Sequence, residues 1–358
     1  MRIAVDATRL LREVRGIGRY VRALLPRFVE QRADVSLLLF SKPADVAKLS
    51  EWVAADPHLS GRAEVESIRN IQKARADVFW YPWNIALPAP AHGTVVATIH
   101  DVANLAVPDP RWTAWGKNFR WRVRYEATVR RATLIVADSA FTANEVHRML
   151  GVPHDRIRVV LLAADDGPVP PLADNGEALK RLGVQAPFVL TVGAADRRKN
   201  YAMLERAVRQ VVSGGARMNL VQAGPRRHTS RKLEEPWLRT LGFVSESDLV
   251  ALYRATTALI MPSNYEGFGL PVLEAMRLGT PVICARTSSL PEVAGDAAAW
   301  FAPGNDVQLA DAITRLITDP SLRESMRAAS LSQEALFSWD TTARQTLAVF
   351  DEAAHVVL

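Results

Sequence analysis

Short apolar runs alternate with amphipathic helical patterns along this 358-residue chain. In the first half, RIAVD (2–6), VSLLLFS (35–41) and ATLIVADS (132–139) have the composition of buried strands, and GRYVRALLPRFVEQ (18–31) has that of a helix. Two further strand-like runs span 77–82 and 93–101. Continuous apolar strands separated by helices are typical of a parallel sheet covered on both faces. The sequence therefore predicts an α/β fold.

The stretch LLAADDGPVPPLADNGEAL (161–179) interrupts this alternation with three prolines, and we interpret it as a linker. Beyond it the alternation resumes with four more strand-like runs: PFVLTVGAA (187–195), MNLVQAG (218–224), TALIMPS (257–263) and PVICA (281–285). In addition, 358 residues exceed what one hydrophobic core usually organises. We therefore expect two doubly wound, Rossmann-like domains. The N-terminal domain is predicted at 1–165, completed by a final helix from about 340 to 358, and the C-terminal domain at 168–338.

Composition narrows the class of protein. Apolar residues make up 49% and charged residues 23% of the chain, as in ordinary globular proteins. A single cysteine, Cys284, leaves no disulfide framework and no cysteine-based metal cluster. The N-terminus carries Asp6 and Arg9 where a signal peptide needs an apolar run, and no apolar run is long enough to span a membrane. We expect a cytoplasmic protein, at most peripheral on the inner face of a membrane.

The net charge of +6 is unevenly distributed. Residues 1–164 hold 24 basic and 16 acidic residues, a net of +8, whereas residues 165–358 hold 20 and 22, a net of −2. This asymmetry favours an anionic partner for the first half, although a solvated basic surface gives the same count. No sequence motif for binding nucleic acid accompanies it.

A helical pattern in the first half, RWTAWGKNFRWRVRYEATVRRA (111–132), combines aromatic and basic residues. Trp112, Trp115, Phe119 and Val123 fall on one face, as expected of a helix that lies on an anionic membrane. Two other interpretations stay open. Aromatic residues on the opposite face also suit a helix buried in its domain, and the excess charge could serve a diphosphate-bearing acceptor.

Ligands of open α/β sheets bind at the carboxyl ends of strands, so the cleft between two such domains is the expected place for chemistry. Gly16 and Gly18 precede a helix, where backbone amides favour an anion, although a simple glycine turn would look the same. Val21 replaces the third glycine of a dinucleotide fingerprint, which argues against an NAD-dependent oxidoreductase. His100 directly follows the strand TVVATI, a position that favours function over a core role.

Two later loops carry stronger signals. In VGAADRRKN a strand ends at Gly193, and the cations Arg197, Arg198 and Lys199 follow it before the next helix. These cations could clamp a diphosphate or lie on a solvated face. SNYEGFGLPVLEAMRLG places Glu266 and Glu274 on either side of an exposed-looking Phe268. A carboxylate near a helix start stabilises the helix dipole by about 0.3–1 kcal/mol, which explains Glu274 but not Glu266 or the glycines. A ligand that combines phosphates with vicinal hydroxyls would suit all of them.

The stretch MPSNYEGFGLPVLEAMRLGTPVICARTSSLPEVAGDAA resembles the E-x7-E region of the retaining, nucleotide-sugar-dependent glycosyltransferases of family 4. GIGRY, HDV, VADSAFTANEV, VGAADRRKN, LGFVSESDLVALYRAT and FSWDTTARQTLAVF resemble other segments of that family in the same order, so the likeness covers nearly the whole chain. It implies the GT-B architecture, with two domains facing across a cleft. Ala194 departs from the arginine that many members carry there, which leaves the cationic role to Arg198 and Lys199.

The resemblance implies roles for the matched residues. Lys199 and Arg198 would bind the donor diphosphate and Glu274 the ribose hydroxyls, while Glu266 would hold the transferred sugar and His100 would lie near its anomeric centre. Further donor contacts would come from the backbone at Gly16, Gly18, Phe243, Val244, Gly267, Phe268, Gly269 and Leu270.

The resemblance also implies a reaction. We expect a hexosyltransferase that moves mannose from GDP-mannose to a lipid-linked or oligosaccharide acceptor in bacterial polysaccharide synthesis. It would need no cofactor and no metal, since the chain lacks an Asp-x-Asp motif. Alternatives are a GDP- or dTDP-rhamnose or UDP-sugar donor and, further away, a GT-B epimerase or a non-catalytic nucleotide-binding protein.

Overall fold

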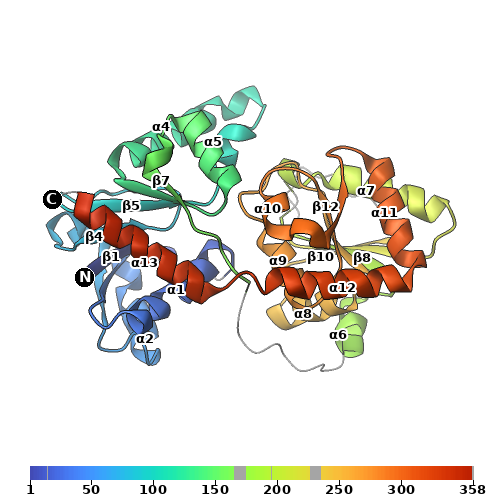
Figure 1. Cartoon of the computed structure of the whole chain (residues 1–358), viewed down its shortest axis with the longest axis horizontal. Coiled ribbons are helices and arrows are strands. Elements are labelled where there is room, and N and C mark those ends of the chain that lie inside the picture. The colour runs from blue at the N-terminus through green and yellow to red at the C-terminus, as the bar shows by residue number, and fades with distance from the viewer. Residues whose placement is uncertain (14, 165–174, 195, 226–234, 357–358) are drawn as a thin grey trace. The chain divides into compact units, whose positions relative to one another are not determined.

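The computed structural model of the chain describes residues 1–13, 15–164, 175–194, 196–225 and 235–356. It divides into two compact units (Figure 1). Unit 1 comprises Met1–Leu162 together with Ser338–Leu358, and unit 2 comprises Ala163–Phe337. Each unit is built on a parallel sheet, so the predicted α/β class is confirmed.

The sheet of unit 1 has seven described strands in the order β3-β2-β1-β4-β5-β6-β7, all paired in parallel. These are β1 (Arg2–Asp6), β2 (Ser36–Ser41), β3 (Ala63–Ser67), β4 (Val78–Tyr81), β5 (Thr94–Ile99), β6 (Leu134–Ala137) and β7 (Ile157–Val159). The inner strands β4, β5 and β6 are buried at every residue, as their continuous apolar sequences require.

Helices connect these strands and carry the residues that follow each strand end. They are α1 (Ile17–Gln31), α2 (Val46–Ala55), α3 (Ala103–Ala106), α4 (Trp115–Arg131), α5 (Ala140–Leu150) and α13 (Trp339–Val356), with short 3-10 turns η1 (Pro43–Asp45), η2 (Ile68–Lys73), η3 (Trp112–Ala114) and η4 (His154–Arg156). Helix α5 begins where Ser139 accepts a hydrogen bond from the amide of Thr142 and ends at Gly151 in the left-handed conformation.

The sheet of unit 2 has six described strands in the order β10-β9-β8-β11-β12-β13, again all parallel. These are β8 (Phe188–Val192), β9 (Asn219–Ala223), β10 (Leu238–Gly242), β11 (Ala258–Met261), β12 (Val282–Ala285) and β13 (Ala298–Phe301). The helices are α6 (Asn175–Leu182), α7 (Tyr201–Ser213), α8 (Glu246–Ala255), α9 (Leu270–Arg277), α10 (Leu290–Ala294), α11 (Asp306–Thr318) and α12 (Pro320–Glu334), with η5 (Arg197–Lys199) and η6 (Gly295–Ala297).

The linker predicted at 161–179 is too long. Helix α6 begins at Asn175, inside the predicted linker, because the segment NGEALKRL has amphipathic helical spacing once the prolines are passed. Residues 165–174 of that linker lie outside the described part of the chain.

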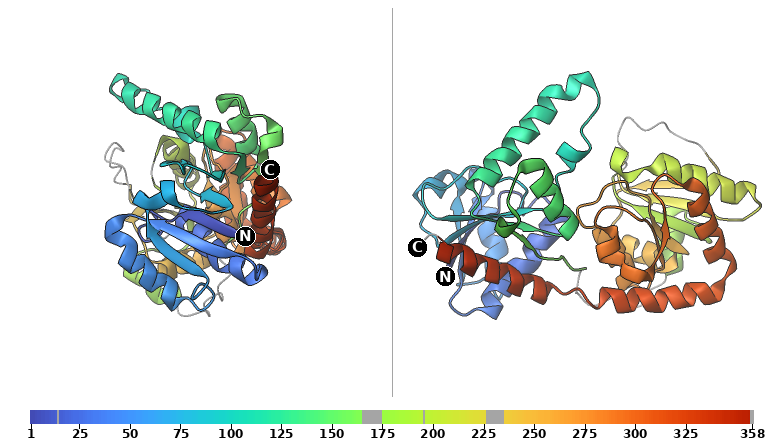
Figure 2. Two further views of the ribbon diagram at one scale, coloured as in Figure 1. Left: turned by 90° about the vertical axis from the view of Figure 1, so that its left-hand side faces the viewer. Right: turned by 45° about the horizontal axis from the view of Figure 1, so that its top comes forward.

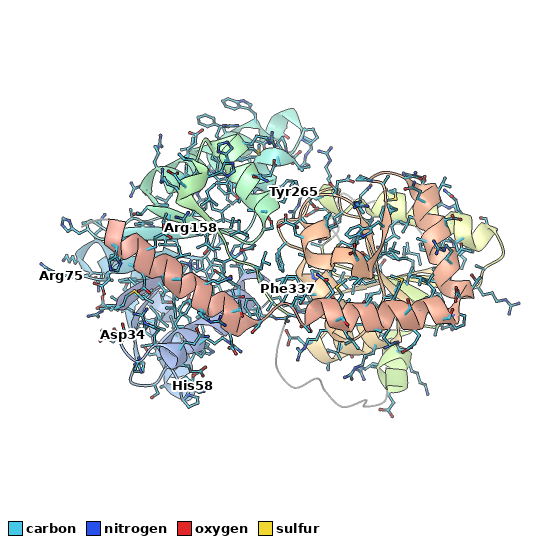
Figure 3. The ribbon with its side chains drawn as sticks, in the orientation of Figure 1. Asp34, His58, Arg75, Arg158, Tyr265 and Phe337 are labelled. Atoms are coloured by element: carbon cyan, nitrogen blue, oxygen red, sulfur yellow. The ribbon has the colours of Figure 1, made fainter. Side chains whose placement is uncertain are left out.

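The last helix, α13, packs in unit 1, and its C-terminal end lies on the same side of that unit as the N-terminus (Figure 2). The ring of Phe350 contacts Phe28 and Trp80, with centroids 5.6 and 5.7 Å apart. Glu352 pairs with Arg158, which lies beside the helix in Figure 3. Helix α13 therefore belongs to the core of unit 1, although the whole of unit 2 separates it from the rest of that unit in sequence.

Candidate active site

The winding of the unit 2 sheet reverses between β8 and β11, the central pair of the strand order. In open parallel sheets the crevice at the carboxyl ends of the strands beside such a reversal is the usual ligand site. The loop after β8 leads into η5, and the loop after β11 leads into α9. Both of the sequence segments with the strongest chemical signal therefore start at the switch point.

Lys199 and Glu266 meet at this point. The ammonium group of Lys199 donates a hydrogen bond to Glu266 Oε1 at 2.7 Å, and the two residues are only 8% and 9% exposed. Two strands that are neighbours in the sheet bring together charges 67 positions apart in the chain. A buried ion pair is costly to desolvate and contributes little net stability, so its presence at a ligand-binding edge favours a functional role.

The backbone around Lys199 is shaped to hold its side chain. Gly193 has φ +128°, and a Cβ there would lie 3.2 Å from Lys199 Cε and 3.4 Å from Nζ. The hydroxyl of Tyr201 donates to the carbonyl of Gly193 at 3.1 Å. Asp196 begins η5 by accepting hydrogen bonds from the amides of Arg198 and Lys199. Glycine at 193 thus leaves the space that the lysine side chain occupies.

Arg198 is adjacent but has a different environment. Its guanidinium pairs with Asp196 at 3.1 Å, and its carbonyl accepts a hydrogen bond from the amide of Asn264 at 2.7 Å. The second contact ties the β8 loop to the β11 loop. Arg197, the third cation of the sequence motif, is exposed. Of the three cations, Lys199 is therefore the one directed into the switch point.

The loop from Glu266 to Gly269 is held by two serines that follow β12. The amide of Glu266 donates to Ser288 Oγ at 3.1 Å, and Ser289 Oγ donates to the carbonyls of Glu266 and Phe268 at 3.0 and 2.8 Å. Gly269 has φ +106°, and a Cβ there would approach Leu290 to 2.9 Å, so the start of α9 requires glycine.

The exposure expected for Phe268 from the sequence is wrong. It looked exposed between two glycines, but it is 5% exposed, and its ring meets that of Phe337 edge-on with centroids 6.2 Å apart. The ring therefore anchors the loop in unit 2, and only backbone groups of Gly267, Phe268, Gly269 and Leu270 remain suited to the ligand contacts predicted for this segment.

Glu274 lies in the second turn of α9, partly buried, and its Oε2 accepts a hydrogen bond from Tyr253 at 2.9 Å. Tyr253 belongs to α8, the helix that follows the loop containing Phe243 and Val244. Phe243 is 70% exposed, whereas Val244 is buried. An aromatic ring on a loop at a strand's carboxyl end is a side chain that suits stacking against a planar ligand.

In unit 1, His100 follows β5 and is buried. Its Nδ1 lies 2.6 Å from Asp138 Oδ2, and its Nε2 lies 2.8 Å from the carbonyl oxygen of Pro82. Burial acts to lower the pKa of His100, but the charge and hydrogen bond of Asp138 and the Pro82 carbonyl outweigh it and raise that pKa. Both ring nitrogens face acceptors, so the doubly protonated ring satisfies them best.

Asp138 was not predicted as a site residue. It follows β6, within the segment VADSAFTANEV, and its other oxygen, Oδ1, is buried with no hydrogen-bond partner among the described residues. The ring of Tyr20 meets that of His100 edge-on, with centroids 5.1 Å apart. Because both nitrogens of His100 are engaged inside unit 1, a direct contact from either of them to a sugar requires one of these two bonds to open.

Gly16 and Gly18 form the entry to α1. Gly16, at φ +56°, is the exposed residue before the helix, and Gly18 is buried. A Cβ at Gly18 would lie 1.4 Å from the carbonyl oxygen of Glu13, so this position excludes every other residue on packing grounds. The glycine turn therefore has a structural reason, and a role in binding an anion is an addition to it.

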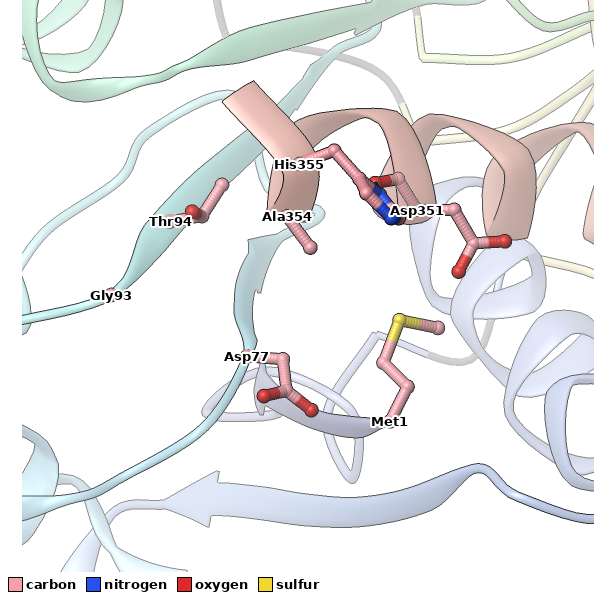
Figure 4. Close-up of a pocket in the computed structure, with 7 residues that line it drawn as sticks. All are labelled: Met1, Asp77, Gly93, Thr94, Asp351, Ala354 and His355. Atoms are coloured by element: carbon pink, nitrogen blue, oxygen red, sulfur yellow. Dashed lines mark hydrogen bonds between the residues drawn. The ribbon is translucent and has the colours of Figure 1, made fainter. Parts of the chain in front are cut away.

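Two further observations concern a pocket in unit 1 and the length of the apolar helices. A pocket of about 380 Å³ in unit 1, lined by Met1, Asp77, Gly93, Thr94, Asp351, Ala354 and His355, lies at the amino ends of β1, β4 and β5 (Figure 4). That is the sheet edge opposite to the one where ligands bind in such folds. Among the described helices, none is both long and apolar enough to cross a membrane.

Comparison with known proteins identifies the family. The model "Glycosyl transferases group 1" matches residues 178–333, and "Glycosyltransferase Family 4" matches residues 14–166. O-antigen chain mannosyltransferase B of Escherichia coli is 31% identical over 93% of this chain and 94% of its own length. The chain belongs to the glycosyltransferases of group 1 and family 4. A D-inositol 3-phosphate glycosyltransferase of Thermobifida fusca is also 31% identical, over 65% of the chain and 58% of its own length.

Solved structures agree on the fold of this glycosyltransferase. Sucrose-phosphate synthase of Thermosynechococcus elongatus superposes with a TM-score of 0.74 at 18% identity, covering 98% of each chain. Anabaena Alr3699/HepE in complex with UDP and glucose gives a TM-score of 0.73 at 18% identity, over 98% of this chain and 100% of its own. The predicted GT-B fold, with two Rossmann-like sheets, is confirmed.

Sequence reasoning missed the residues that orient this glycosyltransferase's candidate groups: Asp138, Asp196, Tyr253, Ser288 and Ser289. Four of them lie in loops after strand ends, and that position was the available signal. Tyr253 lies inside α8 and offered none.

Proposed function

We propose that this glycosyltransferase moves mannose from GDP-mannose to a lipid-linked or oligosaccharide acceptor in bacterial polysaccharide synthesis, on the cytoplasmic side of the membrane. The likeness to an O-antigen chain mannosyltransferase over nearly the whole chain supports the sugar. The observation that carries the chemistry is the buried Lys199–Glu266 pair at the switch point of the unit 2 sheet.

The pair is complementary to a nucleotide sugar. In the proposed complex the donor diphosphate replaces Glu266 as the partner of Lys199, with Arg198 beside it. Glu266, released from the lysine, accepts hydrogen bonds from hydroxyls of the transferred sugar. An ammonium group already fixed in a buried site stabilises the charge that develops on the leaving diphosphate without reorganisation.

Transfer breaks the bond between the anomeric carbon and the β-phosphate oxygen and forms a bond from that carbon to the acceptor oxygen. The acceptor proton passes to the leaving phosphate on the same face of the sugar, so the anomeric configuration is retained. Lys199 and Arg198 supply the positive charge, and the reaction needs no metal ion.

The remaining donor contacts are proposed for the residues to which the family resemblance assigns them. Glu274, oriented by Tyr253, accepts from the ribose hydroxyls, and the loop at Phe243 and Val244 meets the base. The amides from Gly267 to Leu270 contact the β-phosphate. Unit 1 contributes Gly16 and Gly18 towards the phosphate and His100 towards the sugar.

The test is a donor panel. Purified protein is incubated with a lipid-linked or mannose-terminated oligosaccharide acceptor and, in turn, GDP-mannose, GDP-rhamnose, dTDP-rhamnose or UDP-glucose, with and without EDTA. Mass spectrometry reports the sugar added, and the one-bond anomeric C–H coupling reports the configuration. We expect mannose transfer with an α-linkage, unchanged by EDTA. Transfer of another sugar would overturn the donor assignment, and an altered nucleotide sugar formed without acceptor would indicate an epimerase.

Thermal stability distinguishes a protein that binds a nucleoside diphosphate from one that binds NAD. Binding to the folded state raises the unfolding temperature, so GDP is expected to stabilise the protein and NAD is not. Lack of stabilisation by any nucleoside diphosphate would contradict the transferase proposal.

A further inference from the structure

Helix α4 of unit 1 has two apolar faces, and among the described residues only one of them packs against the rest of that unit. Tyr125 is fully buried, and Trp121 packs against the hydrophobic core of the unit. Trp115, Phe119 and Val123, four residues apart along another face, are 73%, 55% and 42% exposed. Helix α4 therefore buries one face in the core of unit 1, at Tyr125, and exposes the other. The side chain of Trp112 lies outside what the structure describes.

Two aromatic rings of the exposed face stack on each other. The rings of Trp115 and Phe119 stack with centroids 5.7 Å apart and planes at 9°. Figure 2 shows one end of α4 extending beyond the rest of unit 1, and the buried residues of the helix lie in its C-terminal half, so the projecting end carries Trp115. Among the described residues of unit 1, none covers this aromatic pair, which stays 73% and 55% exposed.

Positive charge surrounds the pair. Helix α4 contains six basic residues and one acidic residue, Glu126, which lies 3.5 Å from Arg122. Lys117, Arg120 and Arg124 line a hollow of about 340 Å³ with Trp121. Among the described residues these three cations form no ion pair with a carboxylate, and the guanidinium of Arg124 lies 5.6 Å from the Trp121 ring centroid.

We propose that this face of α4, the residues Trp115, Lys117, Phe119, Arg120, Val123 and Arg124, docks unit 1 on the surface of an anionic phospholipid bilayer. Trp115 and Phe119 enter the interface between headgroups and acyl chains, and the cations bind headgroup phosphates. Tryptophan favours this depth because its ring is amphipathic.

Charge selects the bilayer over the other occupants of an exposed aromatic face. A second copy of the chain, docked through the same face, would bring two α4 helices together, each with a net excess of five positive charges. A neutral glycan would stack on the rings without needing the cations. An anionic bilayer satisfies both the apolar face and the charge, and a lipid-linked acceptor would then be presented at the surface on which unit 1 rests.

The test uses the full chain and vesicles of phosphatidylcholine with or without an equal amount of phosphatidylglycerol. We expect co-sedimentation with the anionic vesicles at low salt, loss of binding in high salt and no binding to neutral vesicles. Each basic residue near an anionic leaflet strengthens binding about fivefold, so Lys117→Gln/Arg120→Gln/Arg124→Gln should weaken it on the order of 100-fold. Trp115→Ser/Phe119→Ser should also weaken binding, at unchanged charge.

Matched controls isolate the surface. Arg69→Gln/Lys73→Gln/Arg75→Gln removes the same charge from exposed positions elsewhere in unit 1 and should leave vesicle binding within about threefold of wild type. Leu336→Ser, at a position 75% exposed in unit 2, is the control for the apolar substitutions. Equal weakening by both charge triples, or equal binding to neutral and anionic vesicles at low salt, would overturn the proposal. So would self-association that the Trp115→Ser/Phe119→Ser variant abolishes.

Vesicle binding is measured without donor or acceptor, so its outcome is independent of the mannosyltransferase proposal. Transfer to a water-soluble acceptor should be unchanged in the α4 variants, because none of these residues belongs to the candidate active site.

Discussion

Replacement of Lys199 separates the catalytic from the structural contribution of the buried ion pair. Lys199→Met keeps most of the side-chain volume but leaves the carboxylate of Glu266, 9% exposed, without its partner at 2.7 Å. Breaking a buried pair in this way costs about 3–5 kcal/mol of stability, because one charge stays buried and uncompensated. Losing a fixed donor to a developing anion costs about 100- to 1,000-fold in turnover.

A second substitution distinguishes the two effects. Adding Glu266→Gln to Lys199→Met removes the uncompensated charge, so the free energy of unfolding should recover much of the loss while turnover stays low. Arg197→Ala, which removes an exposed cation two residues away, is the matched control and should leave both quantities near wild type. Lys199→Ala should show the same loss of turnover.

The assays are urea unfolding of the full chain and initial rates of GDP release from GDP-mannose with acceptor present. Turnover within threefold of wild type in Lys199→Met would refute the assignment of Lys199 to the leaving group. Recovery of turnover together with stability in the double variant would show that the lysine acts only by neutralising Glu266.

Three further predictions follow from contacts elsewhere. Glu274→Ala should raise the donor KM about 10- to 100-fold, the worth of a charged hydrogen bond, with kcat little changed, and an unaltered donor affinity would rule out the ribose role. The pKa of His100 is raised in the folded protein, so its pair with Asp138 should stabilise unit 1 fully below about pH 6.5 and lose this contribution as the pH rises through that raised pKa. Urea unfolding at a series of pH values should show this dependence, and Asp138→Asn should flatten it. Truncation after Phe337 should remove hydrogen-exchange protection from unit 1 and spare unit 2, whereas loss confined to 168–335 would contradict the assignment of α13.

The strands predicted from sequence share one property. The nine predicted runs are the inner strands of the two sheets, where burial on both faces imposes an unbroken apolar sequence. The four strands missed, β3, β7, β10 and β13, are the sheet edges. Strands such as AEVES and LRTLG are only partly buried, so their sequences mix charged and apolar residues and carry no continuous signal.

In the candidate site, the sequence could identify individual residues but not which of them contact one another. Lys199 and Glu266 could be selected because both follow inner strands and both resemble family motifs. Their pairing across 67 positions could not, since it depends on which strands are neighbours at the switch point. The roles of Ser288 and Ser289 also depend on that order, because β12 must lie beside β11 for its loop to hold Glu266.

The return of the last helix to unit 1 constrains how the chain can fold as it is made. Trp80 and Phe28 are fully buried, in part beneath Phe350 of α13. During synthesis the first 162 residues leave the ribosome long before that helix exists, so their aromatic face has nothing to pack against while unit 2, contiguous in sequence, can already form its own core. We therefore expect the N-terminal half to finish folding last, and a nascent chain stalled before Trp339 to expose an apolar aromatic surface that is prone to aggregation.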